Sequence, residues 1–372
     1  MSNAVATVGV PGDGSRHTER AYWKKSLAPY ARPHMGRSAF DLLTSVVPYF
    51  ALSYVMYLLL DVNYLYALAV GVPAAGFLLR TYIMFHDCTH GSFMPTKRAN
   101  AWLGSVLALI VYHPFASWRH AHAVHHASAG DLDRRGVGDV PVLTVAEYNA
   151  KSSKGKLIYR LYRNPLLMFG IGPIWALMIQ PRTVKRSERP RIKRSVHVTN
   201  LVLVLAITGM CFLMGPAEFF LVQMPTAWLA GAAGVWLFYV QHQFEDAYWE
   251  STEDWSYADA ALRGSSYLKL PKVLQWFTGN IGLHHVHHLS SRVPNYNLQA
   301  AHDNVPIFHD VPVLTMRDGI KAVGLKLWDE DSGRLVNFAH ADAVAAAAAA
   351  AARQPRAATQ PAGKAAAGTS PA

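Results

Sequence analysis

The chain has 372 residues, of which 51% are hydrophobic and only 16% are charged, a composition that is apolar for a soluble protein of this length. The formal net charge of +11 permits binding to nucleic acid, but basic residues that flank apolar segments more simply meet anionic lipid headgroups, and we expect no nucleic-acid partner. Two cysteines, Cys88 and Cys211, fall in or beside apolar stretches and exclude a disulfide framework.

Residues 1–37 are polar, basic and punctuated by Gly and Pro, which predicts a disordered N-terminal arm. Residues 38–335 follow as one membrane domain. Four segments in it approach the roughly 20 apolar residues that cross a bilayer: 39–60, 64–85, 196–214 and 225–240. Two shorter apolar runs, 102–115 and 166–180, favour interfacial helices. Residues 336–372 are low in complexity and rich in alanine, and predict a disordered tail that is at most transiently helical.

Basic residues predict the orientation of these segments. The loop 181–194 reads PRTVKRSERPRIKR, and the N-terminal arm is basic as well, so both are expected in the cytoplasm. The four spans then form two hairpins, with external turns at 61–63 and around 215–223. The first span is expected to direct insertion, because the first thirty residues lack an apolar signal sequence.

Histidine clusters lie at the cytoplasmic end of this arrangement. The first contains His86 and His90, the second His122, His125 and His126, and the third His284, His287 and His288. Spacings of three and four residues place imidazoles on one helix face, so each cluster can direct several nitrogens at a common centre. Imidazole suits iron, zinc, copper and nickel, and eight ligands exceed the needs of one ion. The pattern favours two adjacent metals over purely structural histidines. Redox-active iron is the leading candidate for these metals.

The segments HDCTH, WRHAHAVHH with SAGDLDRR, YVQHQFED, and GNIGLHHVHHL with VPNYN resemble the membrane fatty acid desaturases, in particular the omega-6 or delta-12 acyl-lipid branch. The resemblance covers about residues 38–310. It implies an all-α integral membrane protein with four transmembrane helices in two hairpins, interfacial helices and a cytoplasmic histidine-rich diiron cap. It also adds His242 to the eight patterned histidines, so that nine imidazoles hold two iron ions (Fe2+/Fe3+) and molecular oxygen serves as co-substrate.

Other polar residues near the clusters have two interpretations. His120 and His285 lie inside the clusters but outside the ligand pattern, and we expect them to support ligands or the fold. We expect structural or solvent-exposed roles for a further group: His113, His197, His302 and His309. Five acidic residues can orient imidazoles or remain solvated: Asp87, Asp131, Asp133, Glu245 and Asp246. For Asp87 the orienting role is favoured.

The resemblance implies insertion of a cis double bond into a monounsaturated, lipid-linked acyl chain, held in an apolar tunnel among the spans. No GxGxxG fingerprint is present, and His113-Pro114-Phe115 is not a cytochrome b5 haem motif, so a separate ferredoxin or cytochrome b5-type protein is expected to donate electrons. A bacterial inner membrane is the expected location, with the active site facing the cytoplasm.

Three alternatives stay open at this point. Sister diiron membrane oxidases, namely acyl hydroxylases, acetylenases, carotenoid ketolases and alkane monooxygenases, need similar histidines. A histidine-dependent metal transporter would place ionisable groups opposite one another within the spans. A haem-binding subunit needs only axial histidine pairs and leaves the HxxHH triads unexplained.

Overall fold

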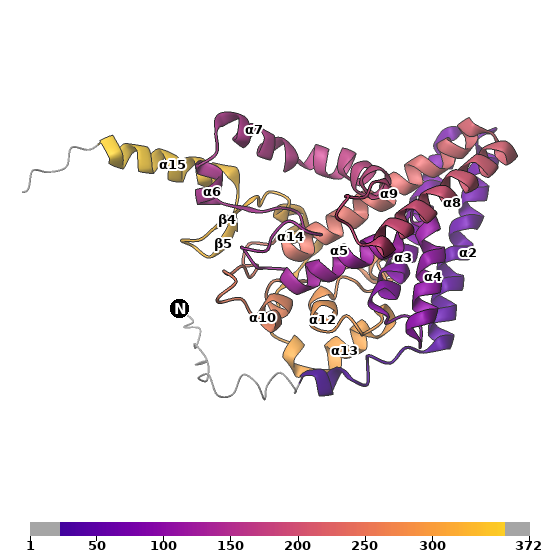
Figure 1. Ribbon diagram of the computed structural model, residues 1–372, viewed down its shortest axis with the longest axis horizontal. Coiled ribbons are helices and arrows are strands. Elements are labelled where there is room, and N and C mark those ends of the chain that lie inside the picture. Colours follow the sequence, from indigo (N-terminus) through magenta and orange to yellow (C-terminus); the bar gives the residue numbers. More distant parts are fainter. Residues whose placement is uncertain (1–22, 354–372) are drawn as a thin grey trace, which may run out of the picture.

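The computed structural model describes residues 23–353, and four long helices dominate it (Figure 1). They are α2 (Met35–Leu59), α3 (Tyr64–His90), α8 (Pro190–Met214) and α9 (Pro216–His242). All four are long and apolar enough to cross a membrane. α2 packs on α3, α8 packs on α9, and α3 and α9 join the two hairpins. The predicted four spans in two hairpins are therefore confirmed.

The helices extend beyond the predicted spans, and the extensions decide where the site lies. With 27 residues each, α3 and α9 are about 40 Å long, which exceeds the roughly 30 Å of a bilayer core. α3 ends at His90, with His86 one turn before it, and α9 ends at His242. The brief external turn predicted around 215–223 is present but shorter than these bounds: α9 begins at Pro216, and Gly215, at φ +93°, makes the turn alone.

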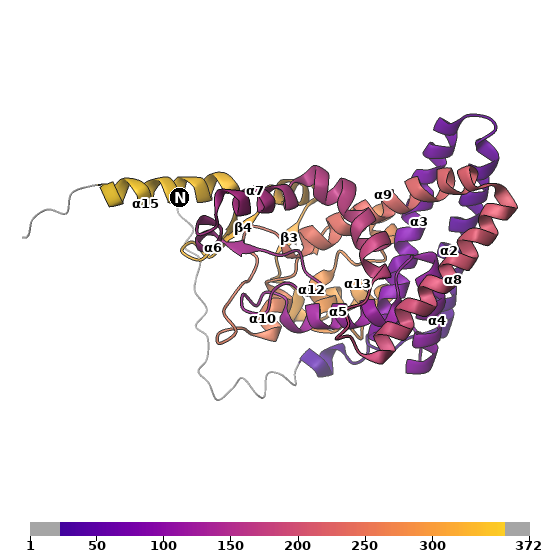
Figure 2. The same ribbon diagram turned by 45° about the horizontal axis from the view of Figure 1, so that its top comes forward.

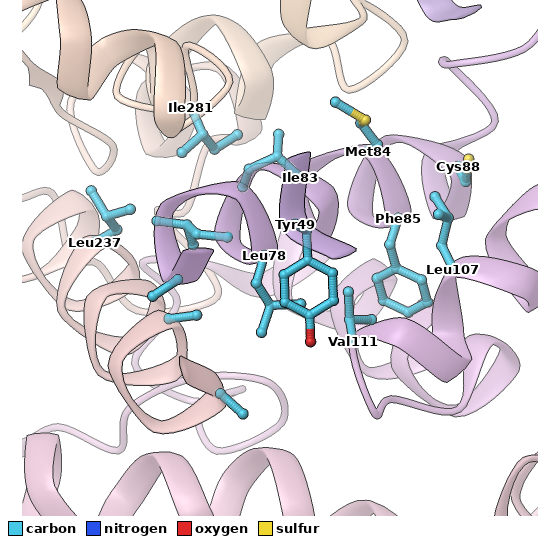
Figure 3. Packing of buried hydrophobic residues seen from close by; sticks show 14 of the residues in the cluster. Tyr49, Leu78, Ile83, Met84, Phe85, Cys88, Leu107, Val111, Leu237 and Ile281 are labelled. Atoms are coloured by element: carbon cyan, nitrogen blue, oxygen red, sulfur yellow. The ribbon is translucent and has the colours of Figure 1, made fainter. Parts of the chain in front are cut away.

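The core of the helical body forms around α3. Its side chains Leu78, Ile83 and Phe85 lie in one buried cluster with Leu237 of α9 and with Ile281 (Figure 3). α3 contacts α2, α4 and α9, and the apolar residues of its second half are buried among them, whereas Leu65 and Val72 in its first half are exposed. This central position fixes the end of α3, and with it the first histidine cluster.

α2 and α8 have the opposite character. Apolar side chains on their outer faces are exposed, and on α8 the exposed fraction reaches 88% at Phe212 and 81% at Leu213. Phe40 and Leu43 on α2 are more than 60% exposed as well. An apolar surface of this extent on two long helices is stable when it faces lipid. The protein is an integral membrane protein.

A sharp bend places the second histidine cluster. Helix α4 (Lys97–Ile110) and helix α5 (Phe115–Ser128) meet at an angle of 104°. The bend contains Tyr112 in the left-handed region, at φ +56°, and Pro114, which begins α5. The predicted interfacial segment 102–115 is thus a helix that turns at its end, and the turn brings α5 against the end of α3.

The rest of the described chain forms a cap of short elements beside the long helices (Figure 2). The segment 166–180, predicted as an interfacial helix, forms two π-helical stretches, η1 (Leu167–Ile171) and η2 (Ile174–Ile179), followed by the 3₁₀ turn η3 (Gln180–Arg182). The remaining helices are α6 (Val145–Asn149), α7 (Ser153–Tyr162), α10 (Tyr257–Leu262), α11 (Lys272–Phe277), α12 (His284–Leu289), η4 (Asn295–Asn297), α13 (Leu298–Asn304), η5 (Pro306–Phe308) and α14 (Met316–Ala322).

Two small sheets add to the predicted all-α architecture without changing it. In the first, β1 (Leu143–Thr144) pairs parallel with β4 (Leu327–Asp329), and β4 pairs antiparallel with β5 (Arg334–Val336). In the second, β2 (Tyr267–Leu268) pairs parallel with β3 (Val313–Leu314). These short strands tie the C-terminal part of the chain to the cap.

Both predicted disordered ends are partly ordered. Residues 23–34 precede α2, where Leu27 is buried and Trp23 stacks on Tyr257. Within the predicted tail, α15 (Phe338–Arg353) is a helix whose Ala341 is buried against α6. Alanine has the highest helix propensity, so an alanine-rich segment can form a helix although its sequence is low in complexity. The rest of both predicted segments, 1–22 and 354–372, lies outside the described residues.

Candidate metal centre

The structure brings all nine predicted histidines together in two groups. The first group consists of His86, His90, His122, His126 and His287. The second group consists of His125, His242, His284 and His288. Within each group, one nitrogen from every ring lies within 4.8 Å of the others. Eight of the nine side chains are less than 10% exposed.

Helix geometry explains how the groups divide. On α5, His122 and His126 are four residues apart and join the first group, whereas His125 joins the second. On α12 the division is reversed, because His287 joins the first group while His284 and His288 join the second. The end of α3 completes the first group and the end of α9 the second. The spacing alone had indicated that each cluster directs its rings at one centre, whereas the second and third clusters each supply rings to both groups.

Acceptors at the far side of three rings fix their orientation. His86 Nδ1 lies 3.1 Å from Asp87 Oδ1, and His125 Nδ1 bonds Asp139. His242 Nδ1 lies 3.1 Å from the backbone oxygen of Gly264. A carboxylate or carbonyl oxygen only accepts, so in each pair the Nδ1–H donates. In a neutral ring the other nitrogen, Nε2, then has a free lone pair.

These lone pairs converge on one another. His125 Nε2 and His242 Nε2 are 3.1 Å apart, although both rings have their proton on Nδ1. His86 Nε2 lies 3.0 Å from His122 Nε2 in the first group. Two lone pairs at this separation repel each other unless a cation lies between the rings. The donor set thus fits metal ions, and it consists of imidazole, which suits iron, zinc and copper.

Burial keeps the third cluster in its neutral form. The pKa values of His284, His287 and His288 all fall well below the usual range, mainly because burial penalises the charged ring and secondly because neighbouring imidazoles would repel it. Neutral imidazole is the form that binds metal. The same burial excludes water from the centre.

Aromatic rings and a cavity surround the two groups unequally. Trp118 stacks on His122 with ring centroids 4.2 Å apart, and its ring lies 5.5 Å from that of His86. In the second group, Phe238 contacts both His125 and His242. His125 and His242 also line a narrow cavity, together with Asp139, Gln243 and Trp249.

The other predicted polar residues divide clearly. Asp87 orients His86, as favoured from the sequence. Asp131 bonds Arg134 and Thr252, and Asp133 accepts from the backbone of Thr252. Glu245 and Asp246 both pair with Arg334. These four carboxylates act in surface and loop structure.

The additional histidines also fall into place. His285 lies 3.0 Å from His302 Nδ1, outside both groups, so its role is structural. His113 is packed against Phe85 and Trp118. His120 is exposed on the opposite face of α5. The ring at His120 is thus a natural control for substitutions of its neighbours.

Sequence reasoning missed Asp139 and Trp118. Asp139 follows His125 by fourteen residues, and its contact depends on a loop with no regular periodicity. The spacing of Trp118 could have identified it, because it precedes His122 by four residues on the same helix face.

A family model described as fatty acid desaturase matches residues 62–313, which is more than half of the chain and includes all nine histidines. The chain belongs to the fatty acid desaturase family. A fatty acid desaturase of Bacillus subtilis is 47% identical over 314 residues, which are 84% of this chain and 89% of that protein. The chain is therefore an enzyme of this family.

More distant relatives bear names that specify a substrate. An sn-1 oleoyl-lipid 12-desaturase of Synechocystis is 27% identical over 61% of this chain and 65% of its own length. A chloroplastic omega-6 fatty acid desaturase of Glycine max is 28% identical over 63% of this chain and 54% of its own length. The predicted resemblance to the desaturases is confirmed at the level of the family.

Proposed function

We propose that this desaturase inserts a cis double bond into a monounsaturated, lipid-linked acyl chain with molecular oxygen. Two iron ions, held by the nine imidazoles, would provide the oxidising power that no amino-acid side chain has. In the overall reaction, two adjacent methylenes each lose one hydrogen. Oxygen takes these two hydrogens with their electrons, and two further electrons and two protons, to give two molecules of water.

The observation that supports this proposal most directly is the convergence of the imidazole lone pairs. In the second group, His125 and His242 direct free Nε2 lone pairs at each other across 3.1 Å, and in the first group the free Nε2 of His86 lies 3.0 Å from His122 Nε2. The two groups share α5 and α12. Iron is favoured over zinc, because removal of hydrogen from an unactivated methylene is an oxidation and zinc has no redox chemistry. Both the family and the all-nitrogen donor set are consistent with this assignment.

The chain's own residues orient the imidazole rings, bury the centre and position the substrate. Asp87, Asp139 and the Gly264 carbonyl hold three rings in the tautomer that leaves Nε2 free. Burial excludes water, which protects an oxidising site from side reactions. The remaining task is to align one methylene pair, for which an error on the order of 1 Å can cost about 100-fold in rate.

The lipid-linked, monounsaturated substrate is supported by the printed names of the relatives, which include an oleoyl-lipid desaturase. The cytoplasmic position of the site is supported by the basic segment 181–194, which lies at the same ends of the helices as the histidines. A bacterial inner membrane and a separate ferredoxin or cytochrome b5-type donor belong to the same proposal. The basic segment would attract an acidic donor.

The test is to profile fatty acids by gas chromatography and mass spectrometry in a bacterial host that makes oleoyl lipids and expresses a ferredoxin or cytochrome b5 donor. We expect a diene with the intact chain and none with His287→Ala. His120→Ala is the matched control, because it removes an exposed imidazole from the same region, and we expect it to retain activity. A hydroxylated product would instead indicate an acyl hydroxylase, one of the sister diiron oxidases.

Metal analysis tests the centre independently of the product. We expect about two iron atoms per purified chain for the intact protein and for His120→Ala, measured by plasma mass spectrometry. Zinc in place of iron, or iron content that is unaffected by His284→Ala, which leaves three rings in the second group, would contradict the proposed centre.

A further inference from the structure

A second polar pocket lies beside the helices, away from the two imidazole groups. It measures about 390 Å3, and its lining includes Arg37, Asp41, Arg80, Trp276 and Asn295. This volume is in the range of ordinary small-molecule sites. The pocket is formed by the start of α2, the middle of α3, α11 and the VPNYN segment that the sequence analysis singled out.

The VPNYN segment fastens these elements together. The backbone N–H of Asn295 donates to Asp87 Oδ2 at 2.7 Å. The hydroxyl of Tyr296 accepts from the backbone N–H of His34, and Asn297 Oδ1 accepts from Arg37 Nη1 at 2.8 Å. One wall of the pocket is thus bonded to the carboxylate that orients His86.

Two buried polar atoms in the lining lack a hydrogen-bond partner. Asp41 is 5% exposed; its Oδ1 pairs with Arg80 at 2.8 Å, but its Oδ2 has no donor. Asn295 is 2% exposed, and its Nδ2 has no acceptor within hydrogen-bonding geometry, although the amide interacts electrostatically with Asp87. A buried group without a partner costs about 1–3 kcal/mol, so these atoms indicate a missing ligand.

The free atoms define the chemistry of that ligand. Asp41 Oδ2 needs a donor and Asn295 Nδ2 needs an acceptor, and a hydroxyl group is both. Arg80 is already committed to Asp41, Ser45 and the Trp276 carbonyl. Arg37 is exposed and uses only two of its five N–H donors in the structure, so its charge can receive an anion.

The surroundings indicate where the ligand comes from. Phe40 also lines the pocket and is 62% exposed on the outer face of α2, where it faces lipid. On α11, Trp276 lines the pocket as well and is 38% exposed. A molecule in this pocket therefore has polar groups inside and apolar surface at the rim.

We propose that this pocket binds the headgroup of an anionic, hydroxyl-bearing phospholipid, with the phosphate at Arg37 and a headgroup hydroxyl between Asp41 and Asn295. The inference rests on the proposed lipid-linked substrate and extends it, because an anchored headgroup fixes how far along the acyl chain the metals act. Free glycerol phosphate has the same polar chemistry but no chains for the apolar rim.

The test measures lipid binding to the full-length purified protein in detergent by native mass spectrometry, without an electron donor, so that no turnover occurs. The probes are dioleoylphosphatidylglycerol, dioleoylphosphatidylcholine with the same chains, and soluble sn-glycerol 3-phosphate. We expect phosphatidylglycerol to bind about 10-fold more tightly than phosphatidylcholine, which corresponds to one good buried hydrogen bond. Glycerol phosphate should bind much more weakly than either lipid.

Two variants locate the preference. Asn295→Ala removes the free amide and keeps the backbone bond to Asp87, and Arg37→Gln removes the exposed charge. We expect Asn295→Ala to lower the preference for phosphatidylglycerol several-fold. Arg37→Gln should weaken the binding of both lipids several-fold, because both carry the phosphate that Arg37 would meet. Asn304→Ala and Arg98→Gln, both at exposed positions outside the pocket, should leave the preference and the binding unchanged.

Three results would overturn the inference. They are equal binding of the two lipids by the intact chain, an undiminished preference in Asn295→Ala, or glycerol phosphate binding as tightly as phosphatidylglycerol. The last result would mean that the pocket binds a soluble glycerol phosphate and not a lipid. Since no turnover is involved, none of these outcomes depends on desaturation, and a failure of the proposed function would instead appear as the absence of a diene.

Discussion

The two imidazole groups have similar ligands and unequal surroundings. The first has five rings and is packed against Trp118, between α3, α5 and α12. The second has four rings, and two of them line a cavity. The first is oriented by Asp87, which is adjacent in sequence, and the second by Asp139 and a carbonyl from distant loops.

This difference teaches that one helical scaffold can build two non-equivalent sites. Five rings can saturate a metal more fully than four, so the second group has more room for an exogenous ligand. The cavity beside His125 and His242 lies where such a ligand would need space. From this asymmetry we expect the first group to hold a metal more tightly, and an exogenous ligand to reach the second group more easily.

Loss of one ring from each group gives the largest expected effect. We expect His90→Ala and His284→Ala each to lower diene formation at least about 100-fold, because loss of a partner of a ligand alone costs about 10- to 100-fold. Their iron contents should differ: four rings remain in the first group after His90→Ala, and three in the second after His284→Ala. Lower iron in His90→Ala than in His284→Ala would invert the comparison.

The orienting carboxylates come next. Asp87→Asn and Asp139→Asn remove the charge that fixes Nδ1–H of His86 and His125, and we expect about 10- to 100-fold weaker metal binding in each. The loss should be confined to the group that contains the affected ring. Competition with a chelator, monitored by residual iron per chain, measures it. Asp133→Asn is the control, because its partner is the Thr252 backbone.

The sequence was sufficient to predict the spans, because the apolar runs have the length that a bilayer requires. It was also sufficient to predict which nine histidines come together, through the family motifs. The sequence could not predict how α5 and α12 divide their rings, since this depends on the angle at which the helices face one another. Nor could it predict Asp139, whose loop has no periodicity. The alanine-rich segment begins with the helix α15, because alanine favours helix strongly even where the sequence is low in complexity.

Trp118 offers a smaller test of the same comparison. Its indole stacks on His122 of the first group, and among the described residues its ring contacts include no imidazole of the second group. Trp118→Leu keeps an apolar side chain but removes the flat ring that holds the imidazole plane, so we expect activity to fall several-fold while iron content falls little. Phe238→Leu is the matched change at the second group. Equal losses in both variants would show that stacking on the first group has no special role.

The smallest effect concerns two buried cations near the end of α9, which have no counterpart at the end of α3. Arg163 is fully buried and bonds Tyr239 and Gln243. Lys326 is 5% exposed, and its ammonium group has no hydrogen-bond partner but lies 5.6 Å from the centroid of the Tyr239 ring. In the described chain neither cation forms an ion pair with a carboxylate. Burial, with Arg163 as the second cause, lowers the pKa of Lys326 to about 8.

Because the folded-state pKa of Lys326 lies below its unfolded value near 10.4, the unfolded chain binds more protons between these values, and the free energy of unfolding rises as pH increases through about 8. Lys326→Met removes the buried charge and fills the same space. We expect a higher Tm than the intact chain at pH 7, with a difference that narrows above pH 8, measured by scanning fluorimetry in detergent. Lys321→Met, on the exposed face of α14, should show no such pH dependence. A constant difference across this range would mean that Lys326 matters for packing and not for charge.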